Sequence, residues 1–197
     1  LVKLGLDQNT IVIYSSDQGF YIGDHGWYDK RWMYEESLKM PFIVKWPGVV
    51  KAGSRNRDLV QNLDYAQTFL EIANAPQPKD MQGLSLVPLL KGETPKNWRK
   101  EIYYHYYEYP SVHMIPRHYG IRTKRYKLMH FYQFGNEWEM YDLKSDPDEL
   151  TNIYGNKETI NLQKNLTNRL KKLRKYYEDG SDVSVRPDYI ELYRKQS

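Results

Sequence analysis

The chain has 197 residues, a formal net charge of +4, a sequence pI near 9.0 and no cysteine. Its apolar share of 40% and charged share of 27% are typical of a soluble globular protein with one domain or two small ones. The lack of cysteine excludes disulfides, thiolate zinc sites and a cysteine nucleophile within this chain. No apolar run approaches the roughly 20 residues that span a bilayer, so we expect no membrane span. The basic balance favours an anionic partner, but no nucleic-acid-binding module is recognisable, so we expect no nucleic acid partner.

Two short strands are predicted in the first part of the chain. Residues 11–15 are rich in β-branched side chains and indicate a buried strand that ends at the loop Asp17-Gln18-Gly19. Residues 41–46 indicate a second strand, which ends at a Pro-Gly turn. The long segment between them shows no clear periodicity, and loops of this length are usually functional or disordered. Because open α/β sheets bind ligands beyond the carboxyl ends of their strands, we expect functional residues directly after the first strand.

A helix and a short helical turn follow the second strand. Asp64 is predicted to cap a helix whose apolar face lies within residues 65–73 and which ends before Pro76. Residues 84–90 suggest a short helical turn before a glycine.

The remaining residues predict a small antiparallel sheet and a terminal helix. The polar segment 91–100 is the expected boundary between a first domain, residues 1–97, and a second, residues 98–197. Four short aromatic runs separated by turn residues indicate about four strands, and these runs are IYYHYYEY, HYGIRT, YKLMHFY and EWEMYDL. The helix is predicted from one apolar stripe, which consists of Leu162, Leu166, Leu170, Leu173 and Tyr177.

The loop after the first strand contains oxygen donors of the kind that hard cations bind. Asp17 supplies a carboxylate and Gln18 an amide oxygen, and calcium takes six to eight oxygen ligands of this kind. Two donors cannot complete that shell, so a metal site here needs oxygens from elsewhere. Taken alone, Asp-Gln-Gly is better interpreted as an ordinary turn.

Further along the same loop lie side chains that suit a tetrahedral oxyanion. His25 can protonate a leaving group or donate a hydrogen bond to a substrate. Lys30 offers a point charge and Arg31 a planar fork, and both suit sulfate or phosphate. Singly, each is also compatible with an idle surface position. The following Tyr-Glu-Glu, residues 34–36, either anchors these cations by charge pairing or starts a helix.

The order of these motifs resembles the carboxyl-terminal half of the type I sulfatases, members of the alkaline-phosphatase superfamily. The first matching block consists of SSDQG, GDHG, a Lys-Arg pair, YEES and MPFIVKWPG. LDYAQTFLEIANAP followed by MQGLSLVPLLKG is similar to the family's next helix and its connection, and YDLKSDPDELTNIYGN to the segment that closes its small sheet. The likeness covers about residues 9–156. It implies an α/β fold class: the carboxyl-terminal part of an alkaline-phosphatase-like α/β sandwich, plus a small antiparallel sheet packed with a terminal helix.

The resemblance also implies roles by position. Asp17 would be a carboxylate ligand of one calcium ion, and Gln18 the neighbouring ligand, where many relatives have asparagine or histidine. Lys30 would contact the sulfate ester and stabilise charge on its oxygens as the S–O bond breaks. His25 matches a substrate-side histidine in part of the family, and Arg31 would support either the sulfate or the glycan.

One departure from the family pattern concerns the nucleophile. In the family it is a formylglycine made from the first residue of a C/S-x-P/A-x-R motif, and this motif does not occur here. In the family, the paired aspartates that complete the calcium shell also lie upstream of the region that this chain resembles. We therefore expect this chain to be roughly the last two-fifths of an enzyme, inactive without the remainder of its own amino-terminal catalytic domain. Relatives are commonly exported, so the resemblance implies a periplasmic or secreted location.

The segment GDHGWYDKRWMYEES resembles the corresponding segment of bacterial enzymes that desulfate glycosaminoglycans and mucin-type glycans. The expected substrate is therefore a sulfated carbohydrate, with 6-O-sulfated N-acetylglucosamine favoured and 2-O linkages still open. His113, Arg117 and His118 either hold a carboxylate or hydroxyl of the sugar or pack and solvate a strand edge. Two alternatives remain: a phosphoester or phosphonate hydrolase of the same superfamily, and a non-catalytic carbohydrate-binding module built on the tyrosine-rich sheet.

Overall fold

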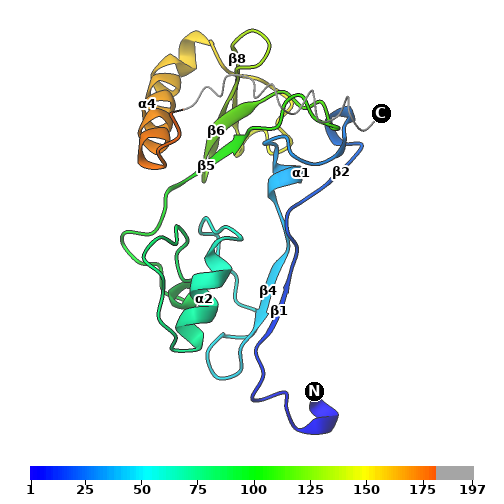
Figure 1. The fold of residues 1–197 in the computed structure, drawn as a ribbon, viewed down its shortest axis with the longest axis vertical. Helices are drawn as coiled ribbons and strands as arrows, with labels where there is room; N and C mark the ends of the chain where they lie inside the picture. The colour runs from blue at the N-terminus through cyan, green and yellow to red at the C-terminus, as the bar shows by residue number, and fades with distance from the viewer. Residues whose placement is uncertain (181–197) are drawn as a thin grey trace, which may run out of the picture. The chain divides into compact units, whose positions relative to one another are not determined.

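The structure is a computed structural model and describes residues 1–180 (Figure 1). Contacts between Cα atoms divide the chain into two compact units. Unit 1 comprises residues 1–18 and 40–100, and unit 2 comprises, of the described residues, 19–39 and 101–180. The inclusion of residues 19–39 in unit 2 was not anticipated from the sequence, and the domain boundary after residue 97 stays a prediction. Within residues 1–180, no helix has the length and apolar character needed to cross a membrane.

Unit 1 contains the two strands predicted from the first part of the chain. After a 3-10 turn, η1 (Val2–Leu4), strand β1 (Val12–Ser15) pairs antiparallel with β4 (Phe42–Lys45). The strands are confirmed, but the prediction that the first is buried is wrong, because Tyr14 is 64% exposed. Its cross-strand partner Ile43 is exposed to the same extent. Only the face with Tyr14 and Ile43 is open among the described residues, because Phe42 on the opposite face stacks on Tyr65 of the following helix.

The helical part of unit 1 is held together by a buried ion pair. Helices α2 (Asp64–Ile72) and α3 (Val87–Leu90) confirm the predicted helix and helical turn. The prediction that Asp64 caps the helix is wrong, because Asp64 is its first helical residue and no side chain caps this end. The buried carboxylate instead binds the Arg99 guanidinium and accepts the backbone N–H of Leu84 at 2.9 Å. These partners connect the start of α2 to the segments that follow it.

Unit 2 is built on the predicted four-stranded antiparallel sheet. Its strands are β5 (Glu101–Tyr106), β6 (His118–Thr123), β7 (Tyr126–Phe131) and β8 (Glu137–Asp142), hydrogen-bonded in that order. A 3-10 turn, η3 (Lys157–Thr159), leads into helix α4 (Ile160–Tyr176), which lies beside the sheet in Figure 1. The predicted apolar stripe is confirmed, because buried leucines of α4 pack on one face of the sheet. The buried residues of this core are Tyr119, Ile121, Leu128, Met140, Leu166 and Leu170.

Residues 19–39 cover the other face of the same sheet. They form β2 (Tyr21–Ile22), a 3-10 turn η2 (Asp24–Gly26), β3 (Tyr28–Asp29) and α1 (Glu35–Leu38). Tyr21 and Met33 are fully buried in a cluster with residues of β7 and β8. Met33 lies so close to Gly120 of β6 that a Cβ there would be 2.5 Å from its sulfur. The sheet therefore supports the segment that contains His25, Lys30 and Arg31, three of the eight predicted site residues.

Candidate functional site

The loop after β1 holds an accessible carboxylate. Asp17 is exposed, and its Oδ1 accepts a hydrogen bond from Ser16 Oγ at 3.1 Å. Its backbone carbonyl accepts one from Asn62 Nδ2 at 3.1 Å. The hydroxyls of Ser15 and Tyr65 lie 2.6 Å apart and join the strand end to helix α2. The backbone of the loop is thus held in place within unit 1 while the carboxylate faces solvent.

Asp17 and Gln18 fit part of a calcium shell by the chemistry of their donors. Both offer oxygen, one charged and one neutral, at adjacent positions. Within residues 1–180, no three His, Cys, Asp or Glu side chains are grouped closely enough to hold a metal ion. A complete shell would therefore take its other oxygens from outside this group.

Gly19, the next residue, lies directly against helix α1 in unit 2. Its N–H donates to the Ser37 carbonyl at 2.9 Å. A Cβ at this position would lie 1.8 Å from the Glu36 carbonyl oxygen and 2.5 Å from that of Lys39. Because backbone atoms cannot yield as a flexible side chain can, only glycine fits here.

His25 is held by an aromatic neighbour and a carboxylate. Its Nε2 lies 3.3 Å from Glu36 Oε2, and its side chain is only 12% exposed. The imidazole stacks on the Tyr34 ring with centroids 4.4 Å apart, and it meets the edge of Tyr21 at 6.3 Å. The ring therefore has a fixed orientation within unit 2.

Asp29 brings two of the predicted substrate-binding residues together. Its Oδ2 accepts a hydrogen bond from the Arg31 guanidinium and lies 3.0 Å from His113 Nδ1. The Arg31 N–H donates to Ser37 Oγ at 3.0 Å, which fixes the backbone on α1. Lys30 lies between Asp29 and Arg31 in the chain and is partly buried. Sequence reasoning missed Asp29, because a carboxylate beside a Lys-Arg pair is common on any surface.

Backbone strain is concentrated around these side chains. Of eight non-glycine residues with positive φ in the described chain, four lie in the two loops that hold the predicted site: His25 (54°), Asp29 (85°), Arg31 (91°) and Met114 (51°). Left-handed backbone costs a non-glycine residue on the order of 1 kcal/mol or more and persists where surrounding contacts enforce it. Strain of this kind clusters at active and binding sites, which marks these loops as functional candidates.

The other two predicted substrate-binding residues lie in the interior. His118 is fully buried, with its ring centroid 5.0 Å from that of Phe131, and its Nδ1 donates to the Pro116 carbonyl at 2.8 Å. Burial lowers the pKa of His118 to about 4, so its imidazole is neutral near pH 7. Arg117 is only 5% exposed and donates to the Tyr109 carbonyl. Neither side chain is presented to solvent in this structure.

A buried charge network fastens α1 to the sheet. Lys127 Nζ lies 3.0 Å from Glu35 Oε1 and 2.7 Å from Glu149 Oε1. The Arg122 guanidinium binds both Glu35 oxygens, at 3.1 and 3.0 Å, and Glu149 accepts the Glu35 N–H at 2.7 Å. Burial alone would raise the pKa of Glu35, but hydrogen bonds from Arg122 and the charge of Lys127 lower it to about 2. The pKa of Glu149 is raised, because burial outweighs its attraction to Lys127.

This network was not predicted from the sequence. Glu35 pairs with Lys127 and Arg122, and Arg31 pairs with Asp29, so these two residues do not pair with each other. The expectation that this segment starts a helix is confirmed by α1. A signal was present in YKLMHF, where a lysine stands in an otherwise apolar and aromatic strand.

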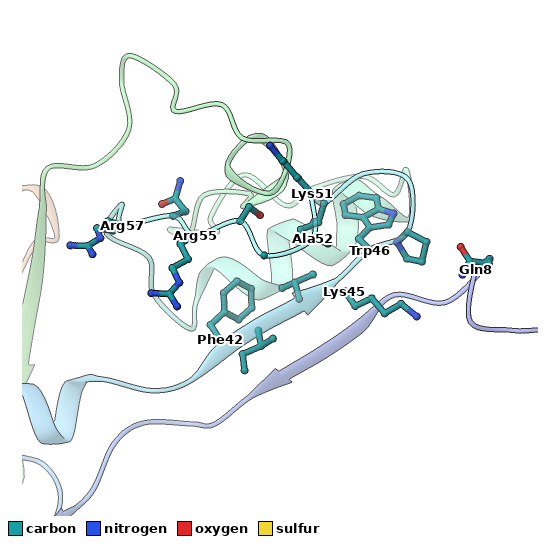
Figure 2. Close-up of a pocket in the computed structure, with 15 residues that line it drawn as sticks. Gln8, Phe42, Lys45, Trp46, Lys51, Ala52, Arg55 and Arg57 are labelled. Atoms are coloured by element: carbon teal, nitrogen blue, oxygen red, sulfur yellow. The ribbon is translucent and has the colours of Figure 1, made fainter. Parts of the chain in front are cut away.

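Unit 1 also contains a surface pocket of about 850 Å³ beside β4 (Figure 2). It is lined by apolar residues such as Phe42 and Trp46 and by four basic residues, which are Lys45, Lys51, Arg55 and Arg57. No acidic residue and none of the predicted site residues line it. The pocket therefore lacks the carboxylates that a metal site requires.

Comparisons with known proteins agree with the motifs. A family model described as N-sulphoglucosamine sulphohydrolase, C-terminal, matches residues 23–176. The chain is similar to an N-acetylglucosamine-6-O-sulfatase of Bacteroides thetaiotaomicron, with 52% identity over 182 residues, which cover 91% of this chain and 33% of the relative. It is also similar to arylsulfatase K of Homo sapiens, with 37% identity over 158 residues, which cover 78% of this chain and 29% of the relative.

A solved structure shows the same fold at high identity. That protein, described as in complex with its substrate D-glucosamine-2-N,6-O-disulfate, matches with a TM-score of 0.88 and 51% identity over 92% of this chain and 37% of its own. The predicted fold class is thereby confirmed. The chain spans about a third of the length of the curated relatives it matches. The family model covers most of the chain, and the chain therefore belongs to the sulfatases, in the region that the N-sulphoglucosamine sulphohydrolase carboxyl-terminal model describes.

Proposed function

We propose that this chain is the carboxyl-terminal part of a longer enzyme that hydrolyses sulfate esters of a glycan. The favoured substrate is 6-O-sulfated N-acetylglucosamine of a glycosaminoglycan or mucin. The observation that carries the proposal is the strained loop of residues 23–31, which contains His25, Lys30 and Arg31. The chain's membership of the sulfatase family gives this loop its proposed role. Export to the periplasm or the exterior is part of the proposal and rests on the family resemblance.

In this proposal, Lys30 stabilises the transition state electrostatically. Charge accumulates on the ester oxygen as the S–O bond breaks, and an ammonium group close to that oxygen lowers the barrier. Arg31 has a different role. Its guanidinium is already bound to Asp29 beside His113, so this group of three presents both donors and acceptors to a sugar.

Asp17 and Gln18 would supply two oxygen ligands of a calcium ion, and a bound calcium would neutralise negative charge on the sulfate. The remaining ligands and the formylglycine would come from the amino-terminal part of the same protein. This part is the expected partner of the chain, and without it we expect no turnover.

We propose two different roles for the remaining predicted substrate-binding residues, which are His113, Arg117 and His118. His113 has a partly exposed side chain and is proposed to contact the sugar directly. Arg117 and His118 are buried, so we propose that they act on substrate binding through the backbone of residues 109–116, to which both donate hydrogen bonds.

A substrate panel tests the proposal in the full-length protein. We expect release of sulfate from 6-O-sulfated N-acetylglucosamine, and a fall of about 100-fold to 1,000-fold in Lys30→Ala, as when other charge-stabilising donors are removed. Lys124→Ala, in the exposed turn between β6 and β7, is the matched control and should keep parent activity. Faster hydrolysis of a phosphonate ester than of the sulfate ester would refute the proposal. Glycan binding without any turnover would also refute it.

A further inference from the structure

The surface pocket beside β4 is formed within unit 1 by this strand and the loop that follows it (Figure 2). Its volume of about 850 Å³ lies within the range of small-molecule sites, about 300–1,000 Å³. The loop is held in shape by its own turns. The N–H of Val50 donates to the Trp46 carbonyl at 2.9 Å, and that of Ser54 donates to the Lys51 carbonyl at 3.1 Å. The pocket therefore has a defined wall in the fold of unit 1.

The four basic residues of the pocket are not neutralised by acidic ones. Lys45, Lys51, Arg55 and Arg57 are all exposed, and no ion pair joins any of them to another residue within 1–180. The nearest acid in the sequence is Asp58, whose carboxylate accepts hydrogen bonds from uncharged side chains at 2.6 and 3.2 Å. In the rest of the sequence, the remaining 25 Lys and Arg residues equal the 25 Asp and Glu residues. The pocket is therefore a local concentration of uncompensated positive charge.

Aromatic side chains alternate with the charged ones along the pocket. Figure 2 shows Arg55 and Arg57 at its left end, Phe42 near the middle, and Trp46 with Lys45 toward the right. The Trp46 ring is partly exposed and offers apolar surface to a ligand. This arrangement suits an extended ligand with negative groups at intervals and apolar surface between them. A sulfated glycan chain has both, because its sulfates and carboxylates are separated by sugar rings.

We propose that this pocket is a second binding site for a sulfated glycan, which holds anionic groups of the chain away from the ester that is hydrolysed. The choice of a glycan as the ligand rests on the proposed function. The guanidinium forks of Arg55 and Arg57 match the oxygens of a sulfate or carboxylate, and like charges lining one cleft attract an anionic chain. Lys45 pairs with Val12 at the start of β1, whereas Asp17 follows the end of this strand. Because the ladder between them is about 13 Å long, only a chain of several sugars reaches both.

The first test measures binding in the full-length protein. A heparin hexasaccharide is titrated into the Lys30→Ala variant by isothermal titration calorimetry at low salt, so that the probe is not consumed. Adding Arg55→Ala and Arg57→Ala should weaken binding by about 10-fold, because two charge-assisted contacts are lost. Lysine at both positions keeps the charge and should recover part of this loss. The control pair, Lys171→Ala with Lys172→Ala, removes the same charge from the exposed side of α4 and should change the affinity by less than about twofold.

The second test measures how turnover depends on the length of the glycan. With Lys30 intact, the double arginine-to-alanine variant should raise KM for a 6-O-sulfated hexasaccharide by about 10-fold without lowering kcat, because binding alone is lost. The 6-O-sulfated monosaccharide is too short to reach the pocket and should lose far less.

Three results would overturn the inference while leaving the proposed function intact. They are parent affinity of the double arginine variant for the hexasaccharide, equal losses on the two substrates, and tighter binding of a single-stranded DNA of equal charge, which would make the pocket a nucleic-acid site. Hexasaccharide binding that depends on the two arginines, in a parent protein that hydrolyses neither substrate, would support the inference and refute the proposed function.

Discussion

Replacing Lys127 with methionine probes the network that fastens α1 to the sheet. Methionine keeps most of the side-chain length but removes the charge that lies 2.7 Å from Glu149 and 3.0 Å from Glu35. Glu35 retains its two hydrogen bonds from Arg122, whereas the fully buried Glu149 side chain retains the Glu35 N–H as its partner. One buried carboxylate is thus left without a counter-charge, which typically costs about 3–5 kcal/mol. Because whole domains are stable by only about 5–15 kcal/mol, this is a severe loss.

The assay is equilibrium urea unfolding of the full-length protein, followed by tryptophan fluorescence. If the loss comes from the orphaned Glu149, adding Glu149→Gln should restore at least half of it, since a neutral amide needs no counter-charge. Two single variants and the double variant give the coupling free energy directly. A loss below about 1 kcal/mol in Lys127→Met, or strictly additive effects in the double variant, would refute this reasoning.

Three further predictions concern residues outside that substitution. The pKa of Glu35 is lowered to about 2 from 4.5, so the stabilisation by its carboxylate is complete above pH 4.5 and is lost as the pH falls toward 2. The free energy of unfolding, measured by urea titration, should fall by about 3 kcal/mol over this range, and Glu35→Gln should lack this fall. Gly19→Ala would place a Cβ 1.8 Å from a backbone carbonyl of α1 and should lower both Tm and turnover, whereas Gly180→Ala meets no atom of residues 1–180 within 4 Å and should change neither. Arg99→Met leaves a fully buried carboxylate in α2 unpaired and should lower Tm more than Arg125→Met, because the ion pair of Arg125 is half-exposed; equal shifts would contradict this ranking.

Local periodicity was sufficient to predict most elements of the fold. The aromatic runs from residue 101 predicted four strands, and the leucine stripe predicted α4 and the face it buries. The packing of residues 19–39 on the sheet was not predictable in this way. It depends on Met33 fitting against Gly120, a contact between residues far apart in the sequence that leaves no local pattern in either segment.

In the candidate site, the sequence pointed to the cations and to Asp17 but not to the carboxylates beside Arg31 and His25. Lys30 and Arg31 stand out as an adjacent pair after glycine turns, whereas Asp29 and Glu36 look like ordinary surface acids until the fold places them beside Arg31 and His25. For His118 the sequence left a sugar contact and a packed strand edge equally open, and the structure buries the side chain fully at the start of β6. Exposure depends on packing between segments, so residue type alone could not decide it.

The central claim is that this chain completes a formylglycine sulfatase whose nucleophile lies outside it. A peptide mass spectrum of the native full-length protein tests this most directly. The account predicts a C/S-x-P/A-x-R peptide amino-terminal to this chain, with its first residue converted to formylglycine. A full-length protein without any such motif would contradict the account and would point to a phosphate-directed hydrolase or a non-catalytic glycan binder.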